Sequence, residues 1–268
     1  AALVRALVKL GERHGAQFLW NADGKRITSQ ANRITGIRLA DGKQLQADVV
    51  IANADPGYVI SNLLDSPAKR ADAISRKQYS MGLFVWYFST SCKYDDVPHH
   101  TILFGNTYRE VLQKIFNTRE LPDDLSIYLH RPSATDSNYA PNGHDSFYAL
   151  VPVPNLQAAI DWPQTEAAFK ALLKSELEKR ILPGLSEVVV DEFCVTPKYF
   201  EQQLLSPWGS GFSITPTLMQ SAGFRFPNRS PDIEGLFFVG AGTHPGAGVP
   251  GVVTSAKVVE RLMFGGVQ

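Results

Sequence analysis

A run of closely spaced glycines near the end of the chain constrains the fold more than any other feature. An unbroken apolar stretch, residues 236–239, precedes the run and is typical of a buried strand. Pro250 suits the first turn of a helix, and apolar residues recur at helical spacing over 252–263. The pattern therefore predicts strand, glycine loop and helix in succession. Free N–H groups and the helix dipole would converge there, as a phosphate or a flavin edge requires.

Residues 246–251 also match the dinucleotide fingerprint G-x-G-x-x-G. That fingerprint opens a Rossmann fold when a βαβ unit follows it and an acidic residue stands about 20 positions further on to bind the ribose. The sequence ends at Gln268, so neither requirement is met. We therefore reject this segment as the opening turn of a Rossmann fold. A loop that only turns the chain stays open as an alternative on the pattern alone.

Residues 238–251 closely resemble the C-terminal flavin-binding signature of the bacterial-type phytoene desaturases. Blocks at 99–105, 108–110, 126–130, 148–154 and 220–222 resemble the same family, in the same order, so the resemblance covers essentially the whole chain. It implies a mixed α/β (α+β) fold: the C-terminal part of a two-domain FAD-binding flavoprotein, of the glutathione-reductase and amine-oxidase type. The family's N-terminal G-x-G-x-x-G turn has no counterpart here, and the chain opens as a helix without a capping residue. We expect a fragment that lacks the first Rossmann βαβ unit and is inactive alone.

The expected organisation is a substrate domain inserted between two parts of a cofactor domain. Residues 1–56 would belong to the FAD-binding domain, 57–231 would form a substrate domain of strands and helices, and 232–268 would return as the closing strand, glycine loop and helix. A helix is predicted to run from the first residues to about residue 14. Hydrophobic patterns predict strands at 18–20, 24–27, 33–39, 48–55, 80–89, 101–104, 125–130, 146–153 and 188–195, and helices at 108–116 and 165–182.

Composition excludes several classes of function. Lys plus Arg and Asp plus Glu number 26 each, which gives no basic surface for nucleic acid. The two cysteines, Cys92 and Cys194, are far apart and form no C-x-x-C pair, which favours reduced thiols and a cytoplasmic location. No apolar run reaches the roughly 18 residues that a membrane span needs. No nucleophile elbow, Walker loop or paired carboxylate stands out, which favours a redox cofactor.

The resemblance implies a set of FAD contacts at two places in the chain. Asn53 and Ala54 would approach the cofactor at the end of the strand predicted at 48–55, although a strand end capped by Asn is an equally good interpretation. His244 lies inside the loop and is the catalytic candidate, as a hydrogen-bond donor to the flavin or as an acid near neutral pH. Its imidazole could instead donate a hydrogen bond to a carbonyl group of the loop. The expected loop contacts are Gly240, Ala241, Gly242, Thr243, Gly246, Gly248, Val249, Pro250 and Gly251.

No metal site is expected. His99 and His100 are adjacent, and neighbouring residues on a strand point to opposite faces, so the two side chains should not share an ion. A surface turn is the favoured interpretation of the pair. His130 ends a predicted strand. Its side chain either faces the substrate cavity or is hydrogen-bonded at the strand end.

The reaction that the resemblance implies is FAD-dependent removal of hydrogen from phytoene towards lycopene, with a hydride passing to flavin N5. The substrate would be a long-chain carotenoid hydrocarbon in an apolar tunnel lined by aromatic residues, with quinone or oxygen as the electron acceptor. Residues 104–116 would make a peripheral contact with the cytoplasmic membrane. Another carotenoid or retinoid oxidoreductase, such as a different desaturase, an isomerase or a saturase, stays open, and so does a non-catalytic lipid-binding module. Expected tunnel residues are Phe84, Trp86, Tyr87, Phe88, Phe104, Tyr128, Phe147, Tyr148, Phe193, Trp208, Phe212 and Phe224.

Overall fold

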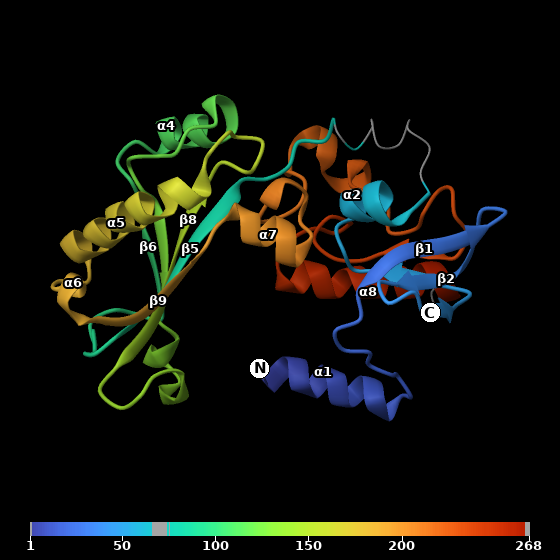
Figure 1. The fold of residues 1–268 in the computed structure, drawn as a ribbon, viewed down its shortest axis with the longest axis horizontal. Helices are drawn as coiled ribbons and strands as arrows, with labels where there is room; N and C mark the ends of the chain where they lie inside the picture. Colours follow the sequence, from blue (N-terminus) through green and yellow to red (C-terminus); the bar gives the residue numbers. More distant parts are fainter. Residues whose placement is uncertain (1, 66–73, 75, 266–268) are drawn as a thin grey trace.

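Two groups of elements, each with its own strands and hydrophobic core, make up the computed structural model, which describes residues 2–65, 74 and 76–265 (Figure 1). The larger group contains a five-stranded antiparallel sheet in the order β6-β7-β8-β5-β9. Its strands are β5 (Gly82–Thr90), β6 (His100–Leu103), β7 (Ile127–His130), β8 (Asp145–Val153) and β9 (Val189–Val195). All five strands that the sequence predicts between residues 80 and 195 are confirmed.

One face of this sheet is buried beneath a long helix, α5 (Trp162–Arg180) (Figure 1). Alternate residues of β8 are fully buried, which is the period expected of a strand with one covered face. Helix α5 begins three residues before the predicted Thr165, because Pro163 lies in its first turn. The core between sheet and helix includes Phe84, Trp86, Phe147, Phe169, Leu173 and Leu177.

The smaller group brings the first part of the chain together with the last. Strand β4 (Val50–Ala52) pairs in parallel with β10 (Leu236–Phe238), as the predicted return of the chain to one sheet requires. An antiparallel sheet of β1 (Gly24–Gln30), β2 (Arg33–Leu39) and β3 (Gln44–Gln46) packs against this pair through a shared apolar core. Helix α8 (Val249–Phe264) follows the glycine loop, as predicted.

Short helices lie in the connections between strands. They are α2 (Pro56–Tyr58), α4 (Tyr108–Gln113), which continues through a further turn to Thr118, α6 (Leu185–Val188) and α7 (Pro197–Leu204). Across residues 2–65, 74 and 76–265, no helix has both the length and the apolar composition needed to cross a bilayer. The domain boundaries expected near residues 57 and 231 remain a prediction.

The N-terminal segment departs from the prediction in one respect. Helix α1 (Ala2–Arg13) forms, although its apolar residues Leu3 and Leu7 are exposed. The predicted strand at 18–20 is wrong: the segment is irregular, and the rings of Phe18 and Trp20 stack with their centroids 5.4 Å apart. Two aromatic residues flanking Leu19 look like strand alternation, but no strand among the described residues pairs with them.

Candidate flavin and substrate site

The two segments expected to contact FAD meet at one edge of the β4–β10 pair. Parallel strands end at the same side of a sheet, so Asn53 and Ala54 after β4 lie beside Gly240 after β10. A Cβ atom on Gly240 would lie 3.0 Å from Oδ1 of Asn53. The structure therefore brings these predicted residues together, at the position where open α/β sheets bind ligands.

The glycine loop is open on its outer side and leads into the N-terminus of α8. Residues 244–250 are exposed apart from the buried Gly246, and Gly248 occupies the N-cap position. Gly246 (φ +132°) and Gly248 (φ +94°) adopt backbone conformations that favour glycine. A Cβ on Gly248 would meet no atom within 4 Å. An open, glycine-rich loop before a helix N-terminus suits the pyrophosphate or ring edge of FAD, so the residues present fit this cofactor.

Arg225 and Asn228 hold the loop from its inner side. Arg225 donates from Nε to the carbonyl oxygen of Thr243 at 3.0 Å and from Nη2 to that of Ala241 at 2.6 Å. Asn228 donates from Nδ2 to the carbonyl oxygen of His244 at 3.0 Å. Sequence reasoning missed both residues, because carbonyl acceptors leave no residue-type signal in a sequence. Phe224 and Phe226, on either side of Arg225, indicate only an apolar segment and give no sign of a functional residue between them.

The imidazole of His244 forms no hydrogen bond with a carbonyl group of the loop among the described residues. Its side chain is exposed and makes no hydrogen bond with the described residues, while its carbonyl oxygen accepts from Asn228. The alternative in which the ring pairs with a loop carbonyl is therefore not observed. The catalytic role of His244 stays a prediction.

A partly buried carboxylate, Asp55, lies directly behind the loop. It accepts a hydrogen bond from the Gly57 backbone N–H at 2.8 Å, which caps α2, and another from the Ser213 hydroxyl. Burial raises the pKa of Asp55, and the hydrogen bonds together with the charge of Arg225 oppose this only in part. Burial and the charge of Asp55 raise the pKa of Tyr79, whose hydroxyl is buried without a partner among the described residues. The sequence indicated Asp55 only as a strand end.

The raised pKa of Asp55 predicts an unusual pH dependence of stability. The folded state holds the proton more tightly than the unfolded state, so the contribution of Asp55 is most favourable below its ordinary pKa of 3.8 and is lost as the pH rises through the raised value. We expect the Asp55→Asn variant to gain stability relative to the parent protein as the pH rises above 3.8. Urea unfolding of both proteins over a pH series measures this difference. A difference that is constant, or that shrinks with pH, would contradict the assignment.

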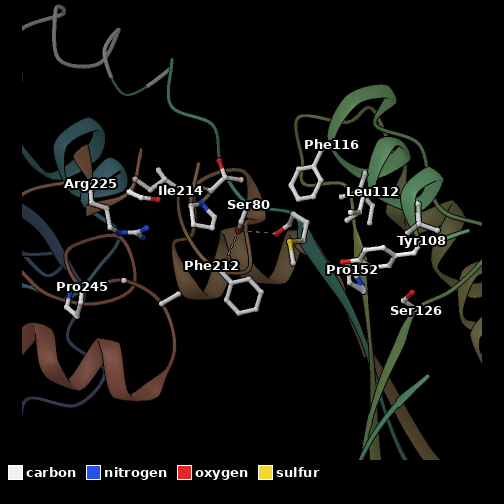
Figure 2. Close-up of a pocket in the computed structure, with 18 of the residues that line it drawn as sticks. Ser80, Tyr108, Leu112, Phe116, Ser126, Pro152, Phe212, Ile214, Arg225 and Pro245 are labelled. Carbon is white, nitrogen blue, oxygen red and sulfur yellow. Dashed lines mark hydrogen bonds between the residues drawn. The ribbon is translucent and has the colours of Figure 1, made fainter. Parts of the chain in front are cut away.

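An apolar cavity of about 630 Å³ reaches from the glycine loop to helix α4 (Figure 2). Pro245, Gly246 and Arg225 line it at the loop end, and Tyr108, Leu112 and Phe116 line it at the helix end. Figure 2 shows Phe212 and Ile214 between these two ends. Such a volume with mostly apolar walls suits a hydrophobic ligand.

The aromatic residues expected to line a tunnel are divided among different environments. Phe212 lines this cavity, as expected, and Trp208 lines a separate and smaller one. The expectation is wrong for four residues, since alternation on β5 and β8 turns them into the core beneath α5: Phe84, Trp86, Phe88 and Phe147.

Comparison with known sequences gives close relatives over the whole chain. The chain is 42% identical over 271 residues to the neurosporene-forming phytoene desaturase of Rhodobacter capsulatus, matching 98% of this chain and 52% of the relative. It is 44% identical over 267 residues to the lycopene-forming phytoene desaturase of Pseudescherichia vulneris, matching 98% of this chain and 54% of the relative. The resemblance to the phytoene desaturases is thus confirmed, and the chain spans about half the length of these relatives.

Solved structures show the fold, and a family model shows the family. An oxidoreductase from Methanosarcina mazei superposes with a TM-score of 0.64 at 18% identity, covering 96% of this chain and 53% of that structure. A redesigned putrescine oxidase superposes with a TM-score of 0.59 at 13% identity, covering 95% and 52%. The mixed α/β fold therefore matches about half of each of these structures. The model of the flavin-containing amine oxidoreductases matches residues 1–259, and the chain belongs to this family.

Proposed function

We propose that the protein catalyses the FAD-dependent desaturation of phytoene. The observation that carries this proposal is the apolar cavity that extends from the glycine loop to α4. The similar phytoene desaturases support the substrate, and they include both neurosporene-forming and lycopene-forming enzymes. We propose lycopene as the end product to be tested first.

Each part of the site has a role in this proposal. The cofactor would lie against Asn53, Ala54 and the outer side of the loop from Gly240 to Gly251, whose inner carbonyl groups Arg225 holds in place. When bound, FAD supplies the acceptor for the hydride that leaves the substrate. The apolar walls bind a hydrocarbon without charged groups and exclude water. The exposed His244 is the proposed donor or acceptor of a proton at its imidazole.

The helix end of the cavity suggests how a membrane-dissolved substrate enters. Phe104, Tyr108 and Phe116 are exposed there, beside Leu112. Exposed apolar side chains in one segment are typical of surfaces that contact a membrane. We propose that this segment makes a peripheral contact with the cytoplasmic membrane, from which phytoene passes directly into the cavity.

Flavin bleaching tests the function. The holoenzyme, incubated without oxygen with phytoene in liposomes, should lose the absorbance of oxidised flavin without added NAD(P). Quinone or oxygen should then restore the absorbance. Bleaching by a polar amine instead of phytoene would move the activity to amine oxidation, and phytoene binding without bleaching would favour a non-catalytic lipid-binding module.

A further inference from the structure

Three histidines from separate parts of the sequence meet at the edge of the five-stranded sheet. His100 on β6 is the direct register partner of His130 on β7. His99 precedes β6, and its carbonyl oxygen accepts from the backbone N–H of Arg131 at 2.9 Å. The ring centroids lie 4.3 Å apart for His99 and His100, 4.6 Å for His99 and His130, and 5.2 Å for His100 and His130.

This arrangement corrects one expectation from the sequence. His99 and His100 were expected on opposite faces, because strand residues alternate. His99 lies just outside β6, so its side chain does not follow the alternation, and both rings lie against His130. One ring nitrogen from each histidine lies within 4.8 Å of the other two. The geometric argument against a shared ion therefore does not hold.

Hydroxyl groups orient two of the three rings. The Nδ1 atom of His99 lies 2.7 Å from Oγ1 of Thr135, and the Nδ1 atom of His100 lies 2.7 Å from the hydroxyl of Tyr128. Metal-binding histidines are typically oriented in this way, with one nitrogen hydrogen-bonded and the other left for the ion. Both contacts use Nδ1 and not Nε2 of the ring. In His99, Nε2 is hydrogen-bonded to Nε2 of His130 at 2.7 Å, and a bound ion would take the place of that hydrogen bond.

A buried ion pair fixes the backbone on both sides of the cluster. Arg131, next to His130, donates from Nε to Asp145 at 2.9 Å and from Nη1 to the carbonyl oxygen of Val97 at 2.9 Å. Val97 lies two residues before His99, so one guanidinium connects the two segments that carry the histidines. On the other side of the ring, Nδ1 of His130 is buried and has no hydrogen-bond partner among the described residues.

We propose that His99, His100 and His130 form a binding site for a divalent transition-metal ion of the zinc type. Three imidazole nitrogens without an oxygen ligand favour zinc, nickel or copper over magnesium or calcium. Zinc–nitrogen bonds of about 2.0–2.1 Å in tetrahedral geometry place ligand atoms roughly 3.3 Å apart. The facing Nε2 atoms of His99 and His130 must therefore separate slightly, which the position of His99 outside the strand permits. A fourth position stays open to water, and the ion would join the edge strand β6 to β7.

Zinc titration of the purified protein tests the site. The protein carries no histidine tag and is first treated with a chelator, and binding is followed by calorimetry. One equivalent of Zn²⁺ should bind, and His100→Ala, at the most exposed of the three positions, should weaken binding at least tenfold. His144→Ala is the matched control, because the ring of His144 is hydrogen-bonded to the carbonyl oxygen of Asn142 and does not belong to the cluster. It should bind zinc as the parent protein does.

X-ray absorption of the zinc-loaded parent protein gives a second measurement that needs no variant. Scattering from three imidazole ligands is the expected result. The proposal is overturned if the parent protein binds no zinc, if His100→Ala and His144→Ala bind it equally well, or if fewer than three imidazoles surround the ion.

Discussion

In the full-length enzyme, replacing Gly248 with valine should weaken flavin binding by about 10- to 100-fold and leave the protein folded. Gly248 has φ +94°, a conformation that a β-branched residue adopts only under strain. Strain of this kind costs on the order of 1–3 kcal/mol, and about 1.4 kcal/mol corresponds to a tenfold change in affinity. The loop can relieve the strain by moving its exposed N–H groups, which are the groups proposed to contact FAD. The ratio of flavin to protein after purification, followed by flavin titration, measures the effect.

Gly143 provides the matched control for this substitution. It also has a positive φ, +81°, and a Cβ atom there would likewise meet nothing within 4 Å. It lies in the turn before β8, away from the glycine loop, so Gly143→Val should retain flavin as the parent protein does. Equal flavin content in both variants would mean that the loop only turns the chain.

Gly242 has a different role from Gly248, although the sequence predicts both as FAD contacts. A Cβ atom on Gly242 would lie 2.6 Å from Cδ of Pro56 and 2.8 Å from Oγ of Ser213. A side chain there would disturb the packing around Asp55 before it reached any cofactor. Gly248 leaves open space where a ligand can approach, whereas Gly242 leaves room for the neighbouring Pro56 and Ser213. Only the three-dimensional surroundings distinguish these two roles.

Periodicity predicted the framework of the fold because burial imposes it. Strand β8 follows from alternating burial, β5 from an unbroken apolar run, and helices α5 and α8 from apolar residues at spacings of three to four. The glycine loop was also predictable, since glycines leave a residue-type signal. Helix α1 shows the limit of this reasoning, because its pattern predicts a helix but does not say what the apolar face contacts.

Long-range polar contacts could not be predicted in the same way. Asp55 and Ser213 are 158 positions apart, and Arg225 is 18 positions from the Thr243 carbonyl group that it binds. Nothing in a single sequence couples such pairs. The prediction that His99 and His100 point to opposite faces failed for a related reason. The geometry of the histidine cluster depends on where β6 begins, and a shift of one residue changes the side of the sheet on which His99 lies.

The second large effect concerns the ion pair of Arg131 and Asp145, whose side chains are 5% and 1% exposed. The Asp145 carboxylate accepts from Nε of Arg131 at 2.9 Å, from the Ser133 hydroxyl at 2.7 Å and from the Tyr94 backbone N–H at 2.8 Å. Asp145→Asn removes the buried negative charge and leaves the guanidinium with the exposed carboxylate of Asp95, 3.4 Å from Nη2, as its acidic partner among the described residues. We expect the free energy of unfolding to fall by about 3–5 kcal/mol, a large part of the roughly 5–15 kcal/mol typical of a folded protein. Urea unfolding measures this loss.

Two further variants separate the buried charge from other causes of the loss. Glu176→Gln breaks the surface pair with Lys179 and should cost less than about 1 kcal/mol, because water screens that pair. Arg131→Met combined with Asp145→Asn removes both charges, so no uncompensated ion remains in the interior. Replacing a buried ion pair with groups of similar volume is often nearly neutral, and the double variant should therefore be more stable than Asp145→Asn alone. If the double variant is instead less stable, the hydrogen bond from Arg131 to the Val97 carbonyl group, and not the buried charge, dominates the energetics of this position.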